Sequence, residues 1–121
     1  MMQIALDHTS VPTRDKVATA EFFARVFGLK YEGPRRDFAP LAISPTLTFN
    51  FEEVPSFEPH HYAFRVALED FDAIRQRLDA NGVPYGGKPH DGDGVIYERA
   101  GDRGLYFDDP NGHGLEVIAR I

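Results

Sequence analysis

The stretch that governs the fold is HHYAFRVALEDFDAIRQRLDANGVPY, residues 60–85. Its opening residues alternate between two faces, which predicts a β-strand. Apolar residues then recur at spacings of three and four, at Phe71, Ile74 and Leu78, which predicts an amphipathic helix with Asp70 as its N-cap. A glycine and a tyrosine close the stretch at the point where a helix would end. Residues 60–85 therefore predict a strand, a helix and a Gly-x-x-Tyr exit.

The same pattern occurs near the N-terminus. LDHTSVP, residues 6–12, predicts a strand, and the apolar spacing from Asp15 onward predicts a helix that ends at Gly28. Each predicted strand contains a histidine, and the distance from that histidine to the helix-ending glycine differs by one position between the two copies. A match of this kind indicates an internal repeat.

Shorter extended segments follow each helix. In the first half they start at Tyr31 and cover 41–43 and 46–53; in the second they lie around Tyr85 and cover 95–99, 104–108 and 115–121. DPNG at 109–112 predicts a hairpin turn. The predicted order is βαβββ, twice. We therefore expect one α+β domain over residues 1–121, with module one at about 1–55 and module two at about 58–121.

Composition excludes several classes of function. The 121 residues carry a net charge of −6 and include no cysteine, so there is no disulfide, thiolate zinc site or cysteine nucleophile. No basic cluster is present to neutralise phosphates, so neither nucleic acid nor a membrane is an expected partner. The start of the chain lacks the pattern of a signal peptide, and no apolar run is long enough to span a membrane. We expect a cytoplasmic protein.

Two histidines and a glutamate are the candidate metal ligands. His8 and His61 each lie in the strand that precedes a helix, and Glu116 lies in the final strand, GLEVIAR. The two-residue period of a strand places all three on the face turned away from the helix, and it favours His61 over His60. Two imidazoles and a carboxylate are a ligand set that holds a divalent metal and leaves positions open for substrate.

Other polar residues receive smaller roles. Arg65 shares a strand face with His61 and is a candidate to neutralise an anionic substrate, while Asn50 is a candidate to donate a hydrogen bond to it. His60 and His113 are assigned to the structure, and His90 to an exposed polar loop. No residue is assigned a catalytic role.

Three segments resemble the vicinal oxygen chelate superfamily, which includes glyoxalase I, extradiol dioxygenases, fosfomycin-resistance thiol transferases and bleomycin-resistance proteins. They are LDHTSVPTRD with FFARVFGLK, then HHYAFRV with FDAIRQRLDANGVPY, and finally GDRGLYFDDPNGHGLEVIAR. The resemblance implies two βαβββ modules that form a cup-shaped mixed sheet. It also implies a divalent metal on His8, His61 and Glu116, a small-molecule substrate, and a homodimer whose metal site lies within one chain or draws on both.

The chain departs from individual branches of that superfamily. Glyoxalase I carries a fourth, carboxylate ligand in the last strand of its first module, where this chain offers Thr48 and Asn50. The phosphonate-binding lysine of the thiol transferases has no match. Two classes of function stay open. One is a metal-dependent lyase, isomerase or dioxygenase with Fe, Mn, Zn, Ni or Mg, since these ligands suit most divalent metals. The other is a metal-free protein that sequesters a small molecule or drug.

Overall fold

A computed structural model describes residues 2–121 and has the expected α+β architecture. The chain divides into two compact units, one extending to Phe57 and the other covering Glu58–Ile121. The elements of the first unit are β1 (His8–Thr13), α1 (Lys16–Phe27), β2 (Ala39–Ser44) and β3 (Leu47–Glu53). Those of the second are β4 (His61–Val66), α2 (Leu68–Ala80), β5 (Tyr97–Arg99), β6 (Asp102–Asp108) and β7 (Gly114–Arg120). Neither helix is both long and apolar enough to cross a membrane.

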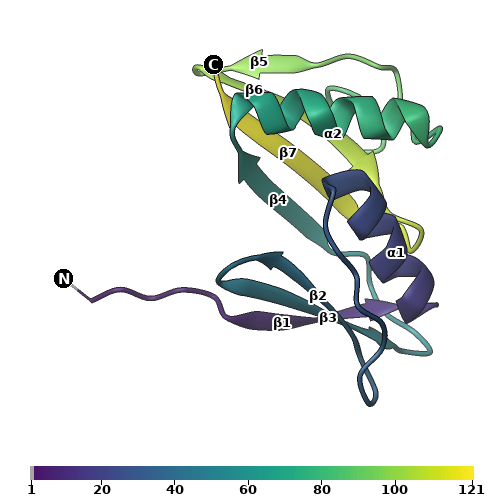
Figure 1. The fold of residues 1–121 in the computed structure, drawn as a ribbon. Coiled ribbons are helices and arrows are strands. Elements are labelled where there is room, and N and C mark those ends of the chain that lie inside the picture. Colours follow the sequence, from purple (N-terminus) through teal and green to yellow (C-terminus); the bar gives the residue numbers. More distant parts are fainter. Residues whose placement is uncertain (1) are drawn as a thin grey trace. The chain divides into compact units, whose positions relative to one another are not determined.

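Each unit contains one mixed sheet with the same kind of topology (Figure 1). The first sheet has the order β1-β3-β2, and the second has the order β4-β7-β6-β5. In both, the strand that starts the unit lies at the sheet edge and runs parallel to the last strand of that unit. The remaining pairs are antiparallel. The repeat seen in the sequence is therefore a repeat of strand arrangement.

The core of the first unit is aromatic. Phe23 of α1 packs against Phe51 of β3 with 4.9 Å between ring centroids, and both side chains are fully buried. The predicted helix ends are confirmed: the Asp15 carboxylate accepts a hydrogen bond from the backbone N–H of Ala18 at 3.0 Å, and Gly28 adopts φ 69° at the C-terminus. A left-handed residue at this place is what a glycine accommodates without strain.

In the second unit α2 buries the three predicted core residues, Phe71, Ile74 and Leu78. The buried apolar side chains of the sheet under it are Leu105, Phe107, Leu115, Val117 and Ala119. The predicted N-cap was wrong, because the helix begins three residues earlier than expected, at Leu68, with Ala67 as a cap that makes no side-chain hydrogen bond. Asp70 lies instead in the first turn, where its charge still favours the helix dipole.

Two predicted strands are much reduced. The stretch from Tyr31 forms only an isolated bridge between Arg35 and Phe38. Pro34 contributes to this, because a residue without an N–H cannot extend a ladder of hydrogen bonds. The stretch around Tyr85 likewise makes a single bridge, onto β6. The first unit therefore reads βαββ, whereas the second keeps the full βαβββ order.

The hairpin predicted at residues 109–112 is confirmed, since it joins the antiparallel strands β6 and β7. The Asp109 carboxylate accepts backbone hydrogen bonds from Asn111 and His113, each at 2.8 Å. His113 is fully buried, and its Nδ1 accepts the backbone N–H of His60 at 2.8 Å. His113 thus ties the start of β4 to the start of β7, which is the structural role expected of it.

Candidate metal centre

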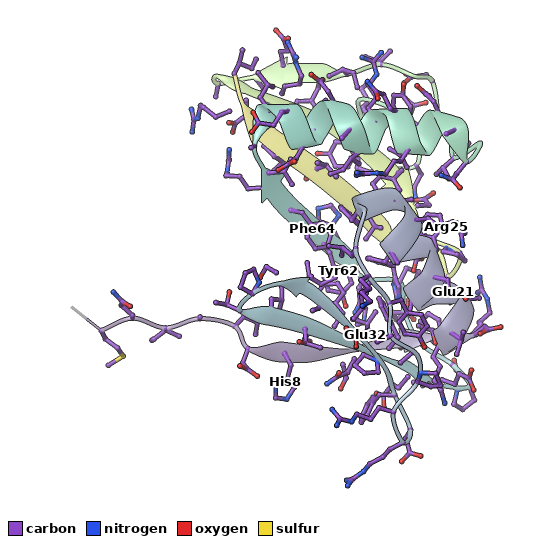
Figure 2. All side chains as sticks on the ribbon, viewed as in Figure 1. His8, Glu21, Arg25, Glu32, Tyr62 and Phe64 are labelled. Atoms are coloured by element: carbon purple, nitrogen blue, oxygen red, sulfur yellow. The ribbon has the colours of Figure 1, made fainter. Side chains whose placement is uncertain are left out.

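The predicted alternation of faces is present in all three ligand-bearing strands. Along β4, His61, Ala63 and Arg65 are exposed, whereas Tyr62, Phe64 and Val66 are partly covered. Along β7, Leu115 and Val117 are fully buried on the side of α2, and Glu116 faces the other way. Figure 2 shows His8 projecting from β1 on the side of that sheet that α1 does not cover. Each proposed ligand therefore lies on the open face of its own sheet.

The geometry around His61 suits a cation. Its Nδ1 lies 3.0 Å from the carbonyl oxygen of Gly114. Because a carbonyl only accepts hydrogen bonds, Nδ1 carries the proton, and in the neutral ring Nε2 carries the lone pair. That Nε2 lies 3.4 Å from Oε1 of Glu116. Two ligands held at about 2.1 Å from one ion, and separated by this distance, subtend an angle of about 110°. A cation between the two atoms would relieve the contact of two electron-rich groups.

His8 shows the same arrangement with a different partner. Its Nδ1 lies 2.8 Å from Oδ2 of Asp7, and an ionised carboxylate also only accepts. The Nε2 lone pair of His8 is again left for a cation. Metal-binding histidines usually donate their other ring N–H to a carboxylate or a carbonyl, which fixes the ring and its tautomer. Asp7 was missed at the sequence level, although its position next to His8 was visible.

Glu116 is buried and held by a tyrosine that the sequence did not single out. The Tyr97 hydroxyl donates to Oε2 of Glu116 at 2.5 Å. Burial and this hydrogen bond raise the pKa of Tyr97 to about 12. Its ring lies across Gly104 on the neighbouring strand, where any Cβ would overlap the ring atoms. The guanidinium of Arg99 stacks 4.5 Å from the centroid of the same ring. The Tyr97 hydroxyl, held in place by these contacts, therefore orients the Glu116 carboxylate.

The first unit contributes a cavity of about 940 Å³. Its floor is the open face of the sheet, where His8 and Thr48 are cross-strand partners and Asn50 lies two residues further along β3. Its wall is the segment 30–38. The structure thus brings His8 and Asn50 to one cavity and brings His61 together with Glu116. Within either unit, no three histidine, aspartate or glutamate side chains of residues 2–121 surround a common point.

Arg65 and His90 both face carboxylates. The guanidinium of Arg65 makes two hydrogen bonds to Asp102, at 3.0 and 3.1 Å. Hydrogen bonding from Arg65, with the positive charges of Arg120 and Arg65, holds the pKa of Asp102 below its usual value. The charge of Arg65 is therefore already matched. His90 is exposed, as expected, and its Nδ1 lies 2.8 Å from Asp108.

Comparisons with known proteins identify the family and agree with the fold. The family model described as Glyoxalase/Bleomycin resistance protein/Dioxygenase superfamily matches residues 5–117. A glutathione transferase FosA of Serratia marcescens is 28% identical over 120 residues, which cover 93% of this chain and 79% of the relative. The solved structure of oxidase ChaP-H2 has a TM-score of 0.91 and 38% identity, covering 99% of this chain and 96% of the other. The fosfomycin resistance protein FosX of Listeria monocytogenes shares the fold, with a TM-score of 0.75 and 24% identity over 99% of this chain and 96% of that one.

Proposed function

The chain belongs to the glyoxalase/bleomycin resistance protein/dioxygenase superfamily, and on that premise we propose that it is a metal-dependent enzyme. Its substrate would be a small molecule that presents two neighbouring oxygen atoms. The observation that supports this most is the shared state of His8 and His61, each with Nδ1 bound to an oxygen and Nε2 left for a cation. Glu116, 3.4 Å from His61, completes the donor set.

The contacts of this site suggest what each residue would do in the reaction. A divalent ion held there would supply Lewis-acid polarisation of the two substrate oxygens, and with Fe or Mn also oxidative chemistry. Similarity to an oxidase at 38% identity favours oxidation over the lyase and isomerase alternatives. Tyr97 keeps Glu116 oriented through its hydrogen bond. Asn50 offers an amide in the cavity that His8 lines, and Arg65, four residues along β4 from His61, offers a guanidinium that is already paired with Asp102.

Metal analysis of protein purified without a histidine tag tests the proposal. We expect stoichiometric Fe, Mn, Zn, Ni or Mg in the wild type, lost in His61→Ala and in Glu116→Ala. His60→Ala is the matched control, because it removes the neighbouring imidazole from the opposite face of the chain and should leave the metal content unchanged. A metal-free wild type that still binds a small ligand would favour the sequestering alternative and would refute the enzyme.

Turnover assays then separate the reaction classes. Metal-loaded protein is supplied in air with catechol, and in parallel with methylglyoxal plus a thiol. Oxygen consumption with catechol, absent in Glu116→Ala, supports an oxidative enzyme. Consumption of the methylglyoxal–thiol adduct without oxygen uptake would instead support the lyase branch.

We propose further that the protein is a cytoplasmic homodimer and that the site joins His8 of one unit to His61 and Glu116 of the other. Mixing two inactive variants shows whether those units belong to one chain or to two. In a mixed dimer of His8→Ala and Glu116→Ala chains, a shared site leaves one intact ligand set, and half of the metal and activity returns. A site within one chain leaves every set broken, and nothing returns.

A further inference from the structure

The wall of the cavity in the first unit carries three cationic side chains, Lys30, Arg35 and Arg36. None of them forms an ion pair with any of residues 2–121. Arg65 of the second unit is in contrast bound to a carboxylate. The cavity also contains two acids, of which Asp7 already receives the hydrogen bond of His8 and Glu32 remains. The cavity therefore has three cations against two acids, whereas the whole chain carries a net charge of −6.

The two arginines are presented by a tight turn. The backbone groups of Arg35 and Phe38 exchange hydrogen bonds in both directions, at 2.8 and 3.2 Å. Arg36 is the first of the two residues inside this turn and adopts φ 57°. This left-handed conformation favours glycine, asparagine or aspartate and strains a long side chain. A long side chain at such a strained position is a feature often found at functional sites.

The other residues that line the cavity indicate what the rest of the ligand should look like. Phe38 and Pro40 line it with apolar surface, and Thr48 and Asn50 add hydrogen-bonding groups on the floor beside His8. A volume of about 940 Å³ lies within the range of small-molecule sites. A ring-sized apolar body with one acidic group matches these features.

We propose that this cavity is an anion subsite, in which Arg35, Arg36 and Lys30 bind a carboxylate or comparable acidic group of the substrate. The inference rests on the proposed function in one respect: His8, a proposed metal ligand, lines the same cavity, so one molecule can reach both. The subsite narrows the substrate class to acids that carry an apolar ring and two neighbouring oxygens.

Binding to EDTA-treated full-length chain, measured by calorimetry, tests the subsite without metal chemistry. The probes are 3,4-dihydroxybenzoate and catechol, which share the vicinal oxygens and differ by one carboxylate. We expect the wild type to bind the acid at least tenfold more tightly than catechol, with the preference shrinking as salt is raised. The double variant Arg35→Gln/Arg36→Gln should lose the preference, whereas Lys16→Gln/Arg25→Gln, which removes the same charge from α1, should retain it. Equal affinities in the wild type, or a preference that survives in Arg35→Gln/Arg36→Gln, would overturn the subsite.

Arg36→Gly provides a second test that a folding defect cannot imitate. Glycine relieves the left-handed strain, so this variant should melt at a temperature equal to or above that of the wild type while it binds the acid several-fold more weakly. An unchanged affinity would overturn the role of Arg36. The two proposals can fail separately: if the wild type contains no metal as purified, and its EDTA-treated form still prefers the acid, the proposed enzyme is refuted and the subsite stands.

Discussion

Gly104→Ala is expected to remove the hydrogen bond that orients Glu116, by displacing the ring of Tyr97 and without contacting Glu116 itself. The added Cβ would overlap the ring of Tyr97, and the ring must swing away because the backbone of β6 is fixed between two strands. The hydrogen bond of 2.5 Å from Tyr97 to Glu116 is then lost, which leaves a buried carboxylate without that donor. A hydrogen bond to a charged group contributes about 2 kcal/mol. At about 4 °C per kcal/mol for a domain of this size, the melting temperature should fall by about 8 °C.

The control repeats the substitution where no ring is present. In a Tyr97→Ala background, Gly104→Ala meets no clash and should be neutral or stabilising by about 0.5 kcal/mol, because alanine loses less backbone entropy than glycine. Thermal melts of the four proteins yield the coupling between the two positions. An equal loss of stability with and without the Tyr97 ring would refute the role assigned to Gly104.

Four further predictions concern pH and helix ends. The pKa of Tyr97 is raised from 10.0 to about 12 in the folded chain, so its contribution to stability is complete below pH 10 and is lost between pH 10 and 12. Urea unfolding across this range should show a loss of about 1 kcal/mol in the free energy of unfolding, after solvent screening, that Tyr97→Phe lacks. The pKa of Asp102 is lowered, so its ion pair with Arg65 stabilises the fold above pH 3.8, and this stabilisation is lost as the carboxylate is protonated at lower pH. Arg65→Gln should therefore be less stable than the wild type at pH 7 and equally stable in acid. A difference in stability that persists at pH 2 would contradict the pairing. In α1, Asp15→Ala should cost about 1 kcal/mol, whereas Ala67→Asp should stabilise α2 by about 0.5–1 kcal/mol, both read from denaturant midpoints.

The features that could be predicted from the sequence are those with a local cause. The period of two along β4 separates His61 from Tyr62 wherever the strand lies, so the open face was predictable. The spacing of apolar residues defines the helices for the same reason. The start of α2 was misplaced because Ala67 makes no side-chain hydrogen bond, and the helix therefore begins without the polar signal that marks α1.

The support of Glu116 could not be predicted, because it depends on strand register. Tyr97 lies opposite Gly104, and Tyr106 lies opposite Glu116, so the Tyr97 ring must cross a strand to reach the carboxylate. That register is established by the turn between β5 and β6, where Ala100 and Gly101 both have positive φ. Nothing in the residue types of β5 alone distinguishes a supporting tyrosine from a surface one.

His8 and His61 each have Nδ1 bound to an oxygen and Nε2 left for a cation, but the two oxygens differ in kind, and the difference matters for the proposed site. The partner of His61 is a main-chain carbonyl at the point where β4 pairs with β7, so its orientation persists as long as the sheet does. The partner of His8 is the carboxylate of Asp7, which precedes β1; the backbone carbonyl of Asp7 accepts the N–H of Thr48 at 2.9 Å, but its side chain is 90% exposed. A charged partner makes an imidazole a stronger donor than a neutral one does, but an exposed side chain holds it less firmly. If the proposed site forms, His8 would therefore be the stronger and less firmly oriented ligand, and His61 the one whose ring is already oriented by the sheet.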